Sequence, residues 1–231
     1  MTATVHPRLA TAGLLLLTAS TGVVDAVSYL ALDRVFTGNM TGNVLFIGFA
    51  LVGVGGIPLL NNVLALAGFA AGSIIGGRIV GRGHPASSWP RRSLGVLIGG
   101  GLVFFALAGL WALLGALEER WLLLVTVLLA AVMGAQVSAV KPIGNSDITT
   151  IVVTNTIANL ARDSRLGGGT GQRWLTRLLA VLCMFAGAAV GAGAIRLWSG
   201  QAALLAGALV FAAAVVVLEI AARRGAAVPS A

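Results

Sequence analysis

The stretch that decides the fold is VFTGNMTGNVLFIGFALVG, which runs from Val35 to Gly53. Its first half carries threonines, glycines and asparagines, and it becomes apolar only from Val44 onward. A helix that crosses a bilayer needs about 20 mostly apolar residues. This stretch is therefore unsuited to a lipid-facing span, and we predict that it forms a broken or re-entrant helix.

A second stretch of this kind runs from Ile148 to Ala161 and is shorter. Its polar residues are Thr149, Thr150, Thr154, Asn155, Thr156 and Asn159. The segments that are long and apolar enough to cross a membrane are 9–32, 57–79, 94–117, 121–140, 174–197 and 202–222. The sequence therefore predicts an all-α transmembrane fold, with six full spans and two short broken or re-entrant helices.

The composition favours a membrane protein over other classes. Of 231 residues, 58% are hydrophobic and 10% are charged, whereas a soluble domain is about 25% charged. The net charge of +8 comes from arginines clustered between apolar runs, a pattern that indicates membrane topology. We expect contact with the lipid bilayer and none with nucleic acid.

The sequence offers little for catalysis or metal binding. His6 and His84 lie outside the apolar segments, and Cys183 is the single cysteine, so no metal cluster is expected within the membrane. A phosphate-binding loop of the kind an ATP-driven pump needs is not found in the sequence. We therefore expect no enzymatic activity, no cofactor and no metal, and any transport would be secondary or passive.

The basic residues distinguish between topologies. If all eight segments crossed with the N-terminus inside, the 15 basic residues would split into 8 inside and 7 outside. With six spans and two re-entrant segments, 12 lie inside and only Arg34, Arg120 and Arg196 lie outside, as the positive-inside rule requires. We therefore predict a multi-pass protein of the cell membrane with both termini cytoplasmic. Because apolar character continues to Leu32, we expect a retained first span and no cleaved signal peptide.

The chain contains a weak internal repeat. An offset of 116 positions aligns Asn39 with Asn155, Asn43 with Asn159, and Phe69-Ala70 with Phe185-Ala186. We predict two repeats in one membrane domain, 1–117 and 118–231, each with one span, one broken segment and two further spans. Three crossings per repeat invert the second copy, so the broken segments would enter from opposite faces and meet near the midplane.

Neutral polar residues dominate the two broken segments. Asn39 and Asn43, like Asn155 and Asn159, are spaced i, i+4, which places both amides on one face of a helix. Such a face suits a polar or ionic solute, and the alternative is that these groups only bond helices together, at about 0.6 kcal/mol each. The candidate pathway residues are Asp25, Asn39, Thr41, Asn43, Gln136, Thr154, Asn155, Thr156 and Asn159.

Asp25 is the only acidic residue well inside an apolar run, where an ionised carboxylate costs about 2.5 to 3.5 kcal/mol on insertion scales. The functional interpretations are a proton-coupling carboxylate or a cation ligand. The structural ones are a cap on a broken helix end or an ion pair with Lys141 or Arg34. Gln136 lies at a comparable place in the second repeat and would be the uncharged counterpart of Asp25.

Glycines repeat every four residues along two of the predicted spans. Small residues at this spacing let helix backbones approach closely within a bilayer. The glycines that we assign to helix packing are Gly68, Gly72, Gly76, Gly187 and Gly191.

Several motifs together resemble one protein family. They are Gly22-x-x-Asp25, Phe36, Asn39-Met-Thr-Gly-Asn43, Gly134-x-Gln136 and the stretch TTIVVTNTIANL at 149–160. They are similar to the YoaK family, also filed as UPF0700 or DUF1275, over nearly the whole chain. Where that family would lead us to expect Thr-Gly-Thr, this chain has Thr154-Asn155-Thr156. The resemblance implies a bacterial inner-membrane location and supplies no substrate.

Taken together, these patterns predict a secondary transporter or channel-like protein for a small polar or ionic solute. The alternative is a non-transporting membrane scaffold or accessory subunit, in which the polar residues only bond helices together. The residues do not specify the substrate, the coupling ion or the direction of transport. They also leave the oligomeric state open and are compatible with an oligomer.

Overall fold

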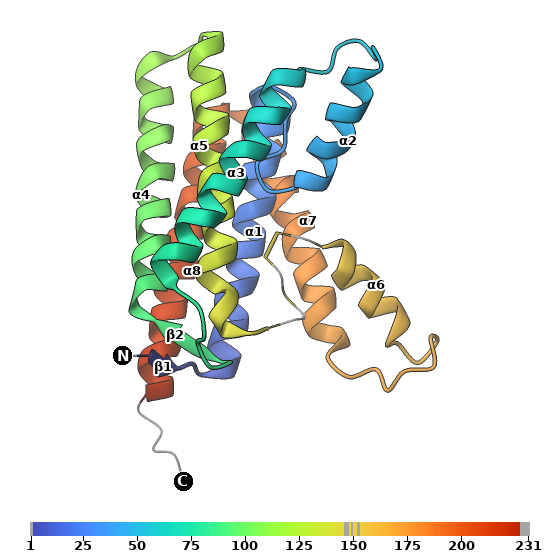
Figure 1. Cartoon of the computed structure of the whole chain (residues 1–231), viewed down its shortest axis with the longest axis vertical. Coiled ribbons are helices and arrows are strands. Elements are labelled where there is room, and N and C mark those ends of the chain that lie inside the picture. The colour runs from blue at the N-terminus through green and yellow to red at the C-terminus, as the bar shows by residue number, and fades with distance from the viewer. Residues whose placement is uncertain (1, 146–147, 149, 152, 227–231) are drawn as a thin grey trace.

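The computed structural model describes residues 2–145, 148, 150–151 and 153–226. In this part of the chain six helices are long and apolar enough to cross a membrane (Figure 1). They are α1 (Pro7–Ala31), α3 (Leu59–Val80), α4 (Arg91–Leu114), α5 (Glu119–Val140), α7 (Trp174–Leu197) and α8 (Gly200–Ala226). The predicted all-α transmembrane fold with six spans is confirmed, and the helix ends differ from the prediction by a few residues.

Two short helices lie in segments that turn back on themselves. We name residues 32–58, which contain α2 (Met40–Leu51), hairpin 1, and residues 144–173, which contain α6 (Thr154–Arg162), hairpin 2. A short 3-10 turn, η1 (Lys141–Ile143), precedes hairpin 2. In Figure 1 hairpin 1 enters from the upper end of the bundle and returns there, whereas hairpin 2 enters from the lower end and returns to it. Thr149 lies outside the described residues.

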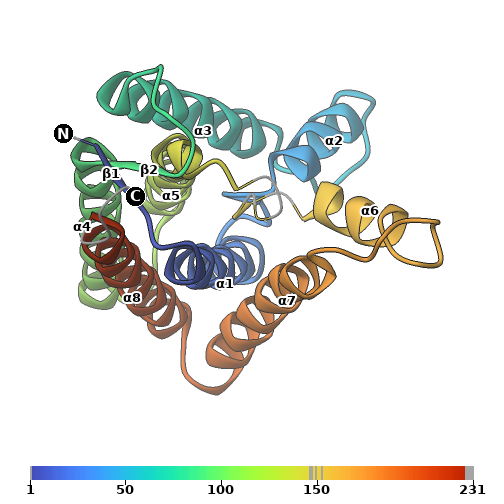
Figure 2. The same cartoon turned by 90° about the horizontal axis from the view of Figure 1, so that it is seen from below.

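The long helices pack in two matching sets. α1 packs against α7 and α8, α5 packs against α3 and α4, and α4 also meets α8. Two of the largest buried side chains, Phe104 of α4 and Phe211 of α8, meet edge to face with 5.1 Å between ring centroids. The buried core therefore runs along the centre of the bundle, and both hairpins lie at its side (Figure 2).

Glycines set the separation of two helix pairs. A methyl group on Gly22 of α1 would collide with the carbonyl of Met184 in α7, and one on Gly134 of α5 would collide with the carbonyl of Phe69 in α3. The glycines spaced four residues apart lie at the same two helix–helix contacts, on the partner helices α3 and α7. Gly68, Gly72 and Gly76 of α3 lie against the backbone of α5, and Gly187 and Gly191 of α7 lie against the backbone of α1. Both pairs are thus in direct backbone contact.

A small β-ribbon, which the sequence analysis did not predict, connects the N-terminal segment to the loop between α3 and α4. β1 (Thr2–Thr4) pairs antiparallel with β2 (Ser88–Pro90) in the loop between α3 and α4. The amide of His6 donates to the carbonyl of Ala221 in α8 at 2.9 Å, and the Thr4 hydroxyl donates to the carbonyl of Gly225 at 3.2 Å. The start of the chain and the end of α8 therefore lie together at the end where hairpin 2 enters (Figures 1 and 2).

Candidate functional site

Asp25 of α1 holds hairpin 1 in place. Its Oδ1 accepts from the amides of Thr37 and Gly38 at 3.0 and 2.7 Å and from the Thr37 hydroxyl at 3.3 Å. Its Oδ2 accepts from the amide of Asn39 at 3.2 Å. These donors precede α2, so their positions correspond to the cap of a broken helix, one of the interpretations left open for this carboxylate.

The glycines of the Thr-Gly-Asn motifs allow this geometry. A Cβ on Gly38 would lie 3.2 Å from Oδ2 of Asp25, so a side chain there would crowd the carboxylate that the backbone has to reach. A Cβ on Gly42 would lie 2.8 Å from the ring of Phe36, which packs beneath the first turn of α2. Gly38 thus leaves room for the carboxylate of Asp25, and Gly42 leaves room for the ring of Phe36.

The side chain of Asn43 holds the turn before α2 by hydrogen bonds to the backbone of Phe36. Its Oδ1 accepts from the amide of Phe36 at 2.9 Å and its Nδ2 donates to the carbonyl of Phe36 at 2.6 Å. The expectation that Asn39 and Asn43 share one helix face is wrong, because α2 begins at Met40 and Asn39 is its N-cap. Asn43 is accordingly buried, whereas Asn39 is exposed.

Gln136 of α5 reaches the tip of hairpin 2. Its Nε2 donates to the hydroxyl of Thr150 at 3.2 Å and, at 3.4 Å, to that of Thr21 in α1. Thr150 has φ +59°, a left-handed conformation that is unusual for a β-branched residue. Among the described residues, Gln136 therefore contacts the second hairpin in the way that Asp25 contacts the first, through fewer and mostly longer hydrogen bonds.

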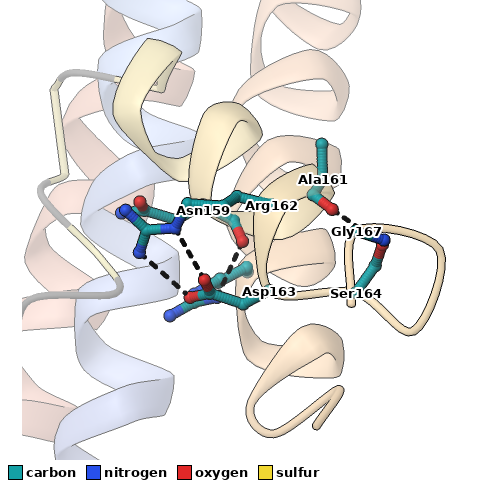
Figure 3. A network of polar contacts seen from close by, with 7 residues as sticks. Asn159, Ala161, Arg162, Asp163, Ser164 and Gly167 are labelled. Atoms are coloured by element: carbon teal, nitrogen blue, oxygen red, sulfur yellow. Dashed lines mark hydrogen bonds and ion pairs between the residues drawn. The ribbon is translucent and has the colours of Figure 1, made fainter. Parts of the chain in front are cut away.

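Charged residues anchor the outer end of hairpin 2. Arg177 of α7 donates through Nη1 to the carbonyl of Asn159 at 3.0 Å and to the carboxylate of Asp163 at 2.8 Å. Figure 3 shows Asp163 just beyond α6, with Arg162 paired to it at 2.7 Å. Hydrogen bonds from Arg162 and then Arg177 lower the pKa of Asp163 below its ordinary value.

At the outer end of hairpin 1, the pKa of a carboxyl group is shifted in the opposite direction. Asp33 follows α1 and is half-buried, and this burial raises the pKa of its carboxyl group, against hydrogen bonds from Asn61 and Thr126. The Thr126 hydroxyl, on α5, donates to it at 3.5 Å. The two hairpins thus end in carboxyl groups whose pKa values are shifted in opposite directions.

A cavity of about 430 Å³ lies where the tips of the two hairpins meet α1 and α7. Four of the predicted site residues line it together: Asp25, Asn39, Thr41 and Thr154. The other described wall residues are mostly apolar and include Tyr29, Phe36, Ile151, Val153, Met184 and Ala192. The cavity is therefore shared between both hairpins, and its described walls carry a carboxylate, an amide and three hydroxyl groups, that of Tyr29 included.

The other predicted site residues are not among the wall residues of this cavity. Asn43 and Gln136 are buried and bond to hairpin 1 and hairpin 2 as described above. Thr156 is buried in α6, Asn155 is exposed one residue after Thr154, and Asn159 is half-buried with its carbonyl bound to Arg177. The asparagines of the second segment are thus not among the described wall residues of the cavity, whereas Asn39 is one.

Sequence analysis missed the aromatic wall. Tyr29 and Phe36 stack with 4.9 Å between centroids and 15° between ring planes. Tyr29 lies four residues after Asp25, on the same face of α1, and this spacing was a usable signal. Met184 lines the cavity from α7, and its sequence surroundings offered no comparable signal.

A larger groove of about 590 Å³ lies between α4 and α8 on the outer face of the bundle. Its described walls are apolar except for Glu219 and Arg223, which pair with each other at 2.9 Å. An apolar groove on the outside of a membrane protein is a place for lipid chains, so size alone does not make it the better solute site. The smaller cavity combines concavity with converging polar groups.

Six long apolar helices and two hairpins that enter from opposite ends define a multi-pass α-helical membrane protein. The chain belongs to the family described as "Protein of unknown function (DUF1275)", which it matches over residues 13–217. It is similar to the UPF0700 transmembrane protein YoaK of Bacillus subtilis (strain 168), with 35% identity over 148 residues. That match covers 64% of this chain and 64% of the relative, which is less than two thirds of the relative's length. No solved structure matches the chain. The family resemblance predicted from the motifs is confirmed.

Proposed function

We propose that this protein is a secondary transporter or channel-like protein for a small polar or ionic solute. The observation that supports the proposal best is the cavity of about 430 Å³, to which both hairpin tips contribute polar groups. Broken helices that expose backbone and side-chain polar groups at membrane depth are tolerated where protein or a water-filled cavity satisfies them. Discontinuous helices of this kind form the solute sites of many transporters.

The proposal includes an inverted repeat made of residues 1–117 and 118–231. The contacts of Gly22 with Met184 and Ala188 correspond to those of Gly134 with Phe69 and Ser73. The offset is 112 between the two glycines and 115 between their partners, close to the 116 that aligns the asparagines. Matching backbone contacts at similar offsets are expected if one packing arrangement occurs twice with opposite orientation.

The proposal also includes an orientation in the cell membrane. The N-terminal ribbon and the end of α8 lie together, at the end where hairpin 2 carries Arg162, Arg165 and Arg173. Short cytoplasmic loops collect basic residues. Placing this end in the cytoplasm puts hairpin 1 on the outer side and hairpin 2 on the inner side.

The second candidate is a non-transporting scaffold or accessory subunit. It is favoured by Asn43 and Gln136, whose amides bond within the fold instead of facing the cavity. It is also favoured by the four hydrogen bonds that Asp25 accepts from hairpin 1. In that case the cavity would be filled by lipid or by another subunit and would be dry.

Thiol accessibility separates the two candidates. In a Cys183→Ala background, a single cysteine is placed at Ala192, which lines the cavity, or at Ala189, which is exposed on the same helix but is not a wall residue. A solute pathway predicts that a membrane-impermeant thiol reagent modifies position 192 in sealed vesicles and leaves the lipid-facing position 189 unmodified. Protection of position 192 from both sides of the membrane would exclude the pathway and support the scaffold.

A further inference from the structure

The cavity between the hairpin tips has one charged wall residue among those that the structure describes. That residue is Asp25, and the remaining described polar groups on the wall, those of Tyr29, Asn39, Thr41 and Thr154, are neutral. Asp25 is half-buried because the cavity reaches its carboxylate. The charge presented to a solute in this part of the chain is therefore negative.

The carboxylate of Asp25 keeps accepting capacity at one of its oxygens, Oδ2. Its Oδ1 takes three hydrogen bonds from Thr37 and Gly38, whereas Oδ2 takes one, from the amide of Asn39, among the described residues. A carboxylate offers about four lone-pair positions over its two oxygens and donates none when ionised. Oδ2 can therefore meet one further donor or cation.

Aromatic rings stand beside this carboxylate. Tyr29 and Phe36 both line the cavity and stack at 4.9 Å with 15° between their planes, so each ring covers one face of the other and at most one face of each ring can meet a solute. Faces of aromatic rings attract cations, and sites for quaternary ammonium groups combine such rings with a nearby negative charge. Apolar residues, among them Ile151, Val153 and Met184, complete the wall and would contact the alkyl part of a solute.

The size and the walls of the cavity disfavour a bare metal ion. A water molecule occupies about 30 Å³ in the liquid, so a cavity of about 430 Å³ has room for an organic molecule. Calcium and magnesium prefer six or more oxygen ligands, and the described residues contain no cluster of three His, Cys, Asp or Glu side chains. A cation with its own apolar surface fits these walls better.

We propose that the cavity binds a small organic monocation of the alkylammonium class, with its charge at Asp25 and its alkyl groups against Tyr29 and Phe36. This rests on the proposed function, because it specifies the solute class of the same cavity. The stacked rings and the single carboxylate give selectivity for charge and for alkyl groups at the same time. An anion of equal size would meet Asp25 with like charge.

The test uses two probes of nearly equal shape. Choline carries a trimethylammonium group, and 3,3-dimethylbutan-1-ol is its uncharged carbon analogue. We expect purified full-length protein in detergent to bind choline about tenfold more tightly than the alcohol, measured by calorimetry and by ligand-induced shifts in melting temperature. Equal affinity for both probes, or binding of neither, would overturn the inference.

Three variants place the probe in the cavity. Asp25→Asn should lower the preference for choline to the roughly two- to fivefold that the aromatic rings supply. Tyr29→Leu should weaken choline binding roughly two- to fivefold without changing the affinity for the alcohol. Ala192→Leu should narrow the cavity and weaken binding of both probes, whereas Ala189→Leu, on the same helix, should leave binding unchanged. Because Asp25→Asn removes part of the hairpin cap, Tyr29→Leu and Ala192→Leu keep the inference testable if that variant does not fold.

The outcome is separable from that of the proposed function. If thiol reagents modify position 192 but choline and the alcohol behave alike, the pathway stands and the cation assignment is wrong. If choline binds with the expected variant pattern but position 192 is protected from both sides in vesicles, the cation site stands and the pathway is wrong.

Discussion

Hairpin 1 and hairpin 2 have the same outline and are held by different chemistry. At its tip, hairpin 1 is bound by an acidic side chain, Asp25, through four hydrogen bonds of 2.7 to 3.3 Å. Hairpin 2 is bound at its tip by a neutral side chain, Gln136, and carries its ion pairs at the outer end, at Asp163. One hairpin thus depends on a charge inside the bundle, and the other depends on charges at its edge.

This difference indicates which change should disturb each hairpin most. A carboxylate within the membrane must keep its hydrogen-bond donors, because an unsatisfied polar group there costs several kcal/mol. The ion pair between Asp163 and the exposed Arg162 contributes little to stability and weakens in salt. We therefore expect hairpin 1 to respond most to substitution at its tip and hairpin 2 to respond most to solution conditions at its outer end.

The largest effect is expected for Asp25→Ala. It leaves the amides of Thr37 and Gly38, both buried residues, without their acceptor, and each unsatisfied buried donor costs about 1 to 3 kcal/mol. We expect a destabilisation of about 2 to 6 kcal/mol, seen as a large fall in melting temperature of the detergent-purified protein. Asp25→Asn keeps one acceptor oxygen and should lose less. A melting temperature for Asp25→Ala equal to that of the parent protein would show that the cap does not stabilise hairpin 1.

A smaller effect is expected for the matching residue of hairpin 2. The bonds of Gln136 are 3.2 and 3.4 Å long, and its buried Oε1 has no partner among the described residues. Side-chain hydrogen bonds between membrane helices average about 0.6 kcal/mol, and the Thr21 hydroxyl keeps its own bond to the carbonyl of Leu17. Gln136→Met should therefore destabilise by less than about 1 kcal/mol, in the same melting experiment. A loss as large as that of Asp25→Ala would mean that the two tips are held with equal strength.

The smallest effect is expected from pH, and its sign differs between the hairpins. The lowered pKa of Asp163 gives hairpin 2 a stabilising contribution that is full above the ordinary value of 3.8 and is lost as the pH falls below it. The raised pKa of Asp33 has the opposite consequence, because its native state favours the protonated form. Mild acid should therefore stabilise the outer end of hairpin 1, whereas stronger acid loosens that of hairpin 2.

Hydrogen–deuterium exchange of the two hairpins, corrected for intrinsic rates, measures this divergence over about pH 6 to 3. Asp163→Asn should remove the acid-induced loosening of hairpin 2 and leave the response of hairpin 1 unchanged. Asp33→Asn should do the reverse. Exchange that rises in parallel in both hairpins would contradict the opposite pKa shifts.

Much of the fold could be predicted because the bilayer restricts it so strongly. Hydropathy located the six spans, and the polar residues after Val35 and Ile148 identified the segments that do not cross. The positive-inside count chose between eight and six crossings. The β-ribbon was missed because strands of three residues, such as Thr2–Thr4, leave no pattern distinguishable from a loop.

The candidate site was predicted less completely, for reasons that concern single residues. Asp25 was identified because an ionised carboxylate is unfavourable in lipid. Its hydrogen-bond donors are mostly backbone amides, and a pattern of side chains does not predict these. The pairing of Asn39 with Asn43 assumed that one helix contains both, and the start of α2 at Met40 separates them. Where a helix begins is the least certain part of such a prediction, and here it decides which amide reaches the cavity.

The bonds between the N-terminal segment and α8 also impose an order on assembly. Thr4 and His6 bond to Gly225 and Ala221, which are residues of α8. Helices that insert one after another during translation cannot form these bonds until α8 has entered the membrane. Pairing of β1 with β2 requires only the loop before α4, so the ribbon can form early, and its attachment to α8 is a late event in biogenesis.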